Sequence, residues 1–191
     1  MSNKEKVLNY LKDTEAYLEG HFVLSSGLHS NQYVQCALLL QHPQIATDVA
    51  NMIAEQYKDK NITCVIGPAL GGVVIAYKVA EALGVRSIFG ERKNGEMCLR
   101  RGFSLSPEDN LLVMEDVITT GKSVKELLDV IKDYGSNIVS VASIVDRSNG
   151  DVNFGCEFLS LLKLEIQTFK PDNLPDWLKS IPAIKPGSRK S

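Results

Sequence analysis

Short apolar runs and helical repeats of apolar residues alternate along most of the chain. Runs bounded by glycine, proline or polar residues predict buried strands at 64–66, 87–89, 111–114 and 138–145. Apolar residues at helical spacing predict helices at 4–18, 43–54, 72–83 and 123–134. Strands that are buried on both faces and separated by helices are typical of a parallel sheet. The pattern therefore predicts an α/β fold with a mostly parallel central sheet flanked by helices.

Three segments fall outside this alternation. Residues 20–36 read as two short extended pieces around a Gly/Ser turn. Residues 92 to about 106 are charged and interrupted by glycine, which indicates a mobile loop or a twisted hairpin over a site. The proline-rich tail, 171–191, is expected to wrap the surface irregularly. With 191 residues, 44% of them apolar, we expect a single domain spanning 1–191 with a small appendage.

Charge and cysteine usage exclude several classes of protein. The formal net charge is -2, from 23 acidic and 21 basic residues, so binding to nucleic acid through a general positive field is not expected. Any anion site must be local. The four cysteines show no paired CxxC spacing, and therefore indicate free thiols rather than zinc or disulfides. No apolar run reaches the roughly 18 residues of a membrane span, and we expect a soluble, cytoplasmic protein.

The most informative segment runs from Leu111 to Ser123. A predicted strand is followed by adjacent carboxylates, Glu115 and Asp116, and then by a Thr-Thr-Gly turn that opens a helix. Backbone N–H groups of such a turn, its hydroxyls and the helix dipole favour a phosphate. The carboxylates would repel a phosphate, so they need ribose hydroxyls or a hard cation as partners. The segment therefore predicts a site for a phosphorylated sugar, against the alternative of solvated acids beside an ordinary helix start.

This segment resembles the phosphoribosyl-pyrophosphate signature of type I phosphoribosyltransferases. The resemblance implies their fold, with a hood at about 1–40 and a flexible catalytic loop. It also implies Mg²⁺, held mainly by substrate oxygens and water. Lys122 departs from the small residue common in orotate enzymes, and its side chain can point outward. The residues implied to bind phosphoribosyl pyrophosphate here are Glu115, Asp116, Val117, Ile118, Thr119, Thr120, Gly121, Lys122 and Ser123.

A second segment, Ala69-Leu70-Gly71-Gly72, also follows a predicted strand and precedes a helix. Its glycines expose backbone N–H groups suited to an anion, although alone it reads as an ordinary turn. In the resembled family this is the pyrophosphate loop. Some orotate enzymes carry a lysine where Gly71 stands, so other cations would have to hold the pyrophosphate in this chain.

Those cations are expected in the 92–106 loop, which holds Arg92, Lys93, Arg100 and Arg101. Departure of pyrophosphate builds negative charge that guanidinium and ammonium groups stabilise, and loop closure excludes water. The alternative is a solvated charged hairpin. Arg92 and Lys93 match the leading basic pair of the orotate enzymes' catalytic loop. The resemblance implies catalytic roles for both and for Asp116, and leaves open which of Arg100 and Arg101 reaches the site.

The identity of the base rests on two further segments. Residues 20–30, including Ser26 and Gly27, resemble the hood that covers the pyrimidine in orotate enzymes, with Ser25 in place of a common lysine. Arg147 follows the last predicted strand, where an arginine can pair with the carboxylate of orotate, unless it pairs with Asp146 instead. Thr119 is expected on the base side. His21 and His29 are expected in turn hydrogen bonds rather than in acid–base chemistry.

The resemblance therefore implies an orotate phosphoribosyltransferase that acts on orotate and phosphoribosyl pyrophosphate, with shared active sites in a homodimer and without nucleic acid or membrane partners. It covers about 20–147 by motif and extends weakly to 185–189. Two alternatives remain open at this point. One is a purine phosphoribosyltransferase with the same phosphate chemistry, and the other is a non-catalytic regulator that senses phosphoribosyl pyrophosphate.

Overall fold

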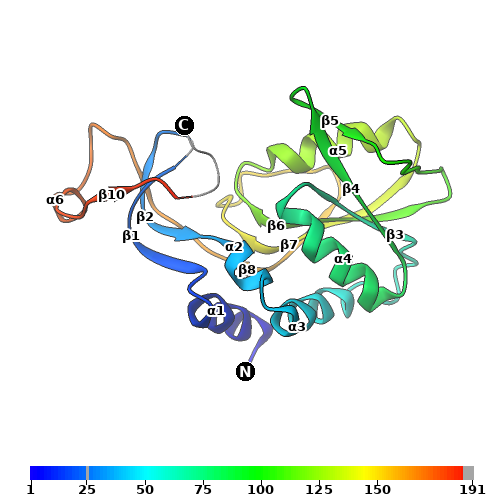
Figure 1. The fold of residues 1–191 in the computed structure, drawn as a ribbon, viewed down its shortest axis with the longest axis horizontal. Helices are drawn as coiled ribbons and strands as arrows, with labels where there is room; N and C mark the ends of the chain where they lie inside the picture. The colour runs from blue at the N-terminus through cyan, green and yellow to red at the C-terminus, as the bar shows by residue number, and fades with distance from the viewer. Residues whose placement is uncertain (25, 187–191) are drawn as a thin grey trace.

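A computed structural model describes residues 1–24 and 26–186. Its centre is a six-stranded sheet in the order β5-β4-β3-β6-β7-β8, parallel except for the edge strand β5 (Figure 1). This arrangement confirms the predicted fold class. The strands of this sheet are β3 (Cys64–Pro68), β4 (Arg86–Lys93), β5 (Glu96–Leu99), β6 (Asn110–Ile118), β7 (Asn137–Asp146) and β8 (Glu157–Lys163).

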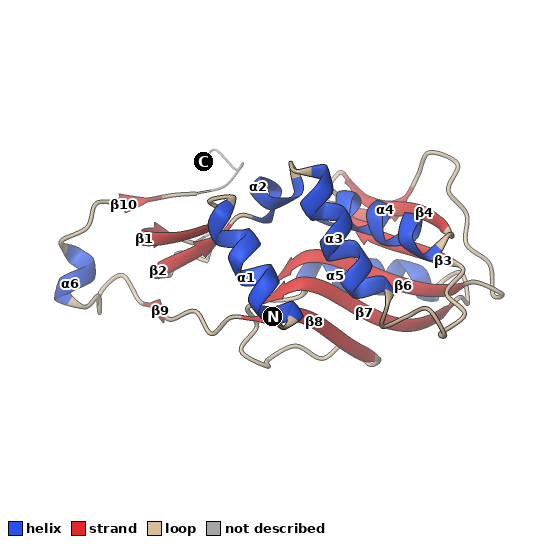
Figure 2. Ribbon diagram, turned by 90° about the horizontal axis from the view of Figure 1, so that it is seen from below, coloured by secondary structure: helices blue, strands red, loops and turns tan. Residues whose placement is uncertain are grey.

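Helices cover both faces of this sheet because its central strands are apolar on both sides. Leu112 and Met114 of β6 pack into one core cluster with α3 and α4, and Leu111 and Val113 pack into a second cluster with α5. Figure 2 shows the ribbons of α3 and α4 on one side of the sheet and α5 on the other. The helices are α1 (Asn3–Asp13), α2 (Cys36–Leu40), α3 (Pro43–Ala54), α4 (Gly71–Leu83), α5 (Lys122–Lys132) and α6 (Asp176–Lys179). No helix among the described residues is long and apolar enough to span a membrane.

A second, smaller sheet lies beside the main one and joins the two ends of the chain (Figure 1). Its order is β10-β1-β2-β9, formed by β1 (Tyr17–Val23), β2 (His29–Val34), β9 (Thr168–Phe169) and β10 (Ala183–Ile184). The hood therefore differs from the expected 1–40 segment. Helices α1 and α2 bury Leu11 and Leu39 in the main core, while the tail contributes strands to the small sheet.

Several local predictions need correction. The first helix ends at Asp13 instead of continuing to 18, because the Thr14 hydroxyl donates to the Tyr10 carbonyl and Glu15 turns the chain with a φ of 55°. The tail expected to be irregular contains α6 and β10, since β10 pairs with β1. By contrast, the hairpin alternative for the segment from 92 is confirmed at its start, where β4 pairs with β5 and left-handed Asn94 and Gly95 form the tip. Helix α2 and strand β8 were not predicted.

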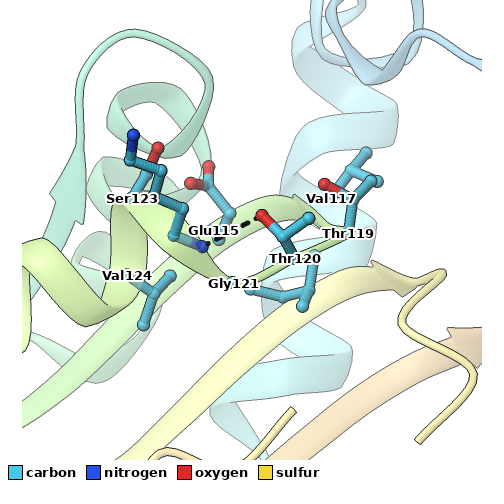
Figure 3. A pocket seen from close by; sticks show the side chains of 9 residues that line it. Glu115, Val117, Thr119, Thr120, Gly121, Ser123 and Val124 are labelled. Atoms are coloured by element: carbon cyan, nitrogen blue, oxygen red, sulfur yellow. Dashed lines mark hydrogen bonds between the residues drawn. The ribbon is translucent and has the colours of Figure 1, made fainter. Parts of the chain in front are cut away.

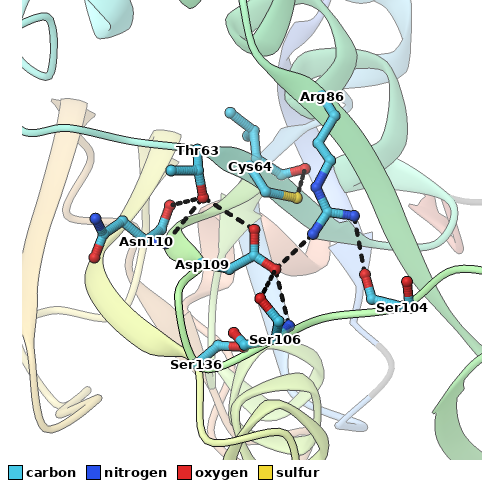
Figure 4. A network of polar contacts seen from close by, with 9 residues as sticks. Thr63, Cys64, Arg86, Ser104, Ser106, Asp109, Asn110 and Ser136 are labelled. Atoms are coloured by element: carbon cyan, nitrogen blue, oxygen red, sulfur yellow. Dashed lines mark hydrogen bonds and ion pairs between the residues drawn. The ribbon is translucent and has the colours of Figure 1, made fainter.

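A network of hydrogen bonds and one ion pair connects residues at the amino ends of the parallel strands (Figure 4). Asp109 accepts hydrogen bonds from Arg86 at 2.6 Å, from Thr63 at 3.0 Å and from the Ser106 backbone at 2.9 Å. Burial opposes ionisation of Asp109, but these donors together hold its pKa below the ordinary value. The network fixes the starts of β4 and β6 and the end of the segment that returns from the hairpin.

Candidate active site

The turn between β6 and α5 forms a small polar cavity of about 70 Å³ at the carboxyl edge of the sheet (Figure 3). Gly121 precedes α5 with a φ of 68° and offers no side-chain cap, while the N–H of Lys122, the first helical residue, donates to the Thr120 hydroxyl at 3.4 Å. The hydroxyls of Thr119 and Thr120 lie on the exposed turn, whereas the side chain of Ile118 is buried in the core. Uncapped N–H groups at the start of a helix favour an anion of phosphate size.

The two carboxylates lie inside β6, because this strand continues beyond the predicted 114 to Ile118 and pairs there with Asp146 of β7. Glu115 is 9% exposed, and burial together with the neighbouring Asp116 carboxylate raises its pKa well above the ordinary value. Burial also raises the pKa of Asp116, against hydrogen bonds that include one from the Val117 N–H at 2.8 Å. Both groups are therefore strong acceptors for a donor that reaches them.

The 69–72 loop lies directly against these carboxylates. A Cβ added to Gly71 would lie 2.6 Å from Asp116 Oδ1, and one added to Gly72 would lie 2.8 Å from the Met114 carbonyl oxygen. The Ala69–Leu70 peptide bond is cis. The structure therefore brings the two predicted motifs together, and a side chain at position 71 would have to displace Asp116.

Of the predicted cations, Arg92 lies closest to the phosphate turn. Its guanidinium donates to Ser123 Oγ at 3.1 Å and to Glu126 Oε2 at 2.5 Å. Lys122 points outward as expected, with its side chain 78% exposed and 3.8 Å from Glu126. Lys93 is exposed at the end of β4, in register with Glu96 of β5.

Arg100 and Arg101 instead contact Glu91 of β4. Arg101 donates to both carboxylate oxygens, at 3.0 and 3.1 Å, and lies over the Phe89 ring at 5.6 Å, while Arg100 is 3.6 Å from Oε1. The Arg101 hydrogen bonds lower the pKa of Glu91. The structure thus brings neither arginine to the phosphate turn, and sequence reasoning missed Glu91 as their counterion because no local motif marks it.

Arg147 does reach the carboxyl edge of the sheet, where its backbone N–H donates to the Ile118 carbonyl at 2.8 Å. The alternative of an Asp146–Arg147 pair is wrong, because Asp146 Oδ1 accepts from the backbone and hydroxyl of Ser148 at 2.8 and 2.6 Å. Arg147 Nε is buried and has no hydrogen-bond partner among the described residues. The Tyr33 ring, which sequence reasoning placed only in the hood, lies 5.8 Å from the guanidinium carbon.

The remaining hood residues contact one another. Gly27 donates to the Leu24 carbonyl at 2.9 Å and has a φ of 82°, so Ser26 and Gly27 form the β1–β2 turn, and their contact with a base stays a prediction. Ser25 lies outside the described residues, as do 187–191. Instead of turn hydrogen bonds, His21 makes two tertiary ones. Its ring Nδ1 is hydrogen-bonded to the Ile181 carbonyl oxygen at 2.9 Å, and its Nε2 to Nδ1 of His29 at 2.5 Å. The bond to Ile181 connects the tail to the hood.

Fold and site together define the class of protein. A phosphate turn, paired carboxylates and a glycine loop meet at one sheet edge, and a phosphoribosyl transferase domain matches residues 37–156. The class is therefore that of the phosphoribosyltransferases.

Comparison with known proteins narrows this class. The chain is 52% identical over 188 residues to the orotate phosphoribosyltransferase of Caldicellulosiruptor saccharolyticus, covering 98% of each chain. It is 50% identical over 179 residues to that of Thermotoga maritima, covering 94% of this chain and 96% of the relative. A phosphoribosyltransferase structure from Corynebacterium diphtheriae matches with a TM-score of 0.71 at 25% identity, covering 86% of this chain and 98% of the other. The chain belongs to the orotate phosphoribosyltransferase family.

Proposed function

We propose that this protein transfers ribose 5-phosphate from phosphoribosyl pyrophosphate to orotate, giving orotidine 5′-phosphate and pyrophosphate in the cytoplasm. The observation that carries the proposal is the juxtaposition of the phosphate turn, the buried Glu115 with its neighbour Asp116, and Gly71 at one sheet edge. The near-full-length likeness to orotate phosphoribosyltransferases favours orotate over a purine base and catalysis over sensing.

In the proposed mechanism, the 119–123 turn holds the 5-phosphate and the two carboxylates accept hydrogen bonds from the ribose hydroxyls. The 69–72 loop and Arg92 hold the pyrophosphate, and Lys93 closes over it. The bond from C1 of the ribose to the pyrophosphate oxygen breaks as the bond to the base nitrogen forms, and the proton of that nitrogen passes to water or to the departing pyrophosphate. Positive groups fixed near the departing oxygens stabilise the charge that develops there.

The described residues fit a magnesium ion that is held mainly by substrate. Glu115, which lines the cavity at the phosphate turn, and the adjacent Asp116 are carboxylates that could share such an ion with substrate. Oxygen ligands from substrate, water and one or two carboxylates suit this ion. When bound, magnesium supplies positive charge to the pyrophosphate leaving group.

We also propose that a second copy of the chain covers the outer side of α4. Leu70, Val74 and Tyr77 are 86%, 45% and 64% exposed, and their spacing puts them on one side of the helix start. Apolar side chains gathered at this spacing are typical of a protein contact. The face continues directly from the 69–72 loop, so a partner there would lie beside the active site.

The reaction is tested by following the loss of orotate absorbance with purified protein, phosphoribosyl pyrophosphate and magnesium. Wild type is expected to turn over, and Lys93→Ala is expected to lose about 100-fold in kcat because one leaving-group cation is removed. Lys132→Ala, an exposed lysine at the end of α5, serves as the matched control. Equal activity of Lys93→Ala and wild type contradicts the role of Lys93.

Two further outcomes test the substrate and the metal. Turnover of adenine or hypoxanthine, with no turnover of orotate, contradicts the proposed substrate. Unchanged turnover of orotate after chelation of magnesium contradicts the magnesium requirement.

A further inference from the structure

Arg147 is a partly buried cation, and none of the ion pairs among the described residues includes it. Its Nε is buried and has no hydrogen-bond partner among the described residues, and the neighbouring Asp146 is occupied by Ser148. Burial lowers the pKa of Arg147, as expected for a desolvated cation. Partial desolvation of a charge is unfavourable, so favourable contacts with its surroundings are needed to offset this cost.

The Tyr33 ring provides the clearest of these surroundings. The guanidinium carbon lies 5.8 Å from the ring centroid, within the range of a cation–π interaction. Tyr33 is itself held by the Phe22 ring at 5.8 Å and by its place opposite Leu18 in the β1–β2 ladder. This contact connects the small sheet to the end of β7, since Tyr33 belongs to β2 and Arg147 follows Asp146.

We propose that Tyr33 is a positioning residue for base specificity, whose ring face orients the Arg147 guanidinium toward the carboxylate of the incoming base. This inference rests on the proposed function. A guanidinium recognises a carboxylate through two parallel N–H groups in one plane, so its orientation matters as much as its charge. Discrimination for the carboxylate therefore depends on a hood residue that acts through Arg147.

The test compares Tyr33→Leu with Tyr33→Phe, which keeps the ring. Binding of orotate and of uracil, the same ring without the carboxylate, is measured together with KM for phosphoribosyl pyrophosphate. In Tyr33→Leu, orotate binding is expected to weaken about tenfold, with little change in uracil binding or in KM of phosphoribosyl pyrophosphate. Tyr33→Phe is expected to behave as wild type. Equal loss for orotate and uracil, or no loss for either, overturns the inference.

A double-mutant cycle with Arg147→Gln provides an independent check. If Tyr33 acts through Arg147, adding Tyr33→Leu to Arg147→Gln lowers orotate binding little further, whereas additive losses overturn the inference. Tyr17→Leu, a half-buried tyrosine of the same small sheet, is the matched control and is expected to keep the preference for orotate over uracil.

If Tyr33→Leu does not fold, pentafluorophenylalanine is placed at this position. This residue weakens the attraction of the ring for a cation at nearly constant shape, and it must reduce the preference for orotate over uracil. Absence of orotate turnover in wild type contradicts the proposed function instead, before any variant is compared.

Discussion

At the scale of single residues, the Glu115–Asp116 pair shows how a binding site opposes stability. Each carboxyl is desolvated, and this burial raises its pKa above the ordinary value. For Glu115, the charge of the neighbouring Asp116 raises the pKa further. A group whose pKa is raised by folding binds more protons in the folded state. Its contribution to the free energy of unfolding therefore falls as pH rises above the ordinary carboxyl pKa of about 4.5.

Replacing Glu115 by glutamine is expected to stabilise the free protein at neutral pH. The amide oxygen can still accept from the Asp116 N–H, which bonds Glu115 Oε1 at 3.1 Å, but no buried charge is formed. We expect a gain of about 1–2 kcal/mol near pH 7 that shrinks toward pH 4.5, with weaker binding of phosphoribosyl pyrophosphate. Thermal unfolding across this pH range measures the gain, and the exposed Glu165→Gln is the control. A variant less stable than wild type at pH 7 would contradict this account.

At the scale of elements, the β6–turn–α5 unit depends on the backbone at Gly121. Its φ of 68° is left-handed, and a Cβ there would lie 2.9 Å from Cε1 of the Phe154 ring. The sequence predicted a turn at this glycine from its position before a helix. It could not predict Phe154, which reaches the turn from a segment more than thirty residues further along the chain.

Gly121→Ala and Gly84→Ala separate these two effects. Gly84, at the end of α4, has the same φ of 68° but no atom within 4 Å of an added Cβ. Both substitutions are expected to destabilise by about 1 kcal/mol from backbone strain, and Gly121→Ala by a further 1–3 kcal/mol from the contact with Phe154. Denaturant unfolding measures both. Only Gly121→Ala is expected to weaken phosphoribosyl pyrophosphate binding, and equal effects of the two variants would refute the contact.

At the scale of the whole molecule, the two ends of the chain and the proposed partner shape the site. The small sheet is assembled from residues near both termini, and it places Tyr33 against Arg147. The exposed apolar residues of α4 lie beside the main sheet, whereas α6 lies at the far end of the small sheet (Figure 1). A partner that covers α4 would therefore leave α6 uncovered.

The proposed dimer predicts a specific response to a charge on α4. Tyr77→Glu is expected to weaken self-association by about tenfold or more, because a carboxylate would be desolvated in an apolar interface. Light scattering over a range of concentrations measures the mass, and a shared active site predicts a parallel loss of activity. Trp177→Glu on α6, where the side chain is 51% exposed, is the control. A Tyr77→Glu protein that stays dimeric would place the interface elsewhere.

Sequence patterns predicted the four central strands of the main sheet, β4, β3, β6 and β7, because their signals are local. A continuous apolar run predicts a buried strand such as β3, and apolar residues at helical spacing predict the helix from Pro43 to Ala54. The 119–121 turn was predicted for the same reason, since backbone conformation and hydroxyl chemistry occur within a few residues. The sequence did not predict two strands of the small sheet, β9 and β10. Each is only two residues long, and so short a strand leaves almost no periodic signal in the sequence.

By itself, the sequence determined the α/β class, the position of the phosphate turn and the chemical types of the groups around it, all of which depend on neighbours along the chain. Only the tertiary structure decided which partner each charge has. Asp146 binds Ser148 rather than Arg147, Arg101 binds Glu91, and Arg147 lies against Tyr33. The physical reason is that electrostatic and cation–π interactions depend on distance and burial in space, which adjacency in sequence does not determine.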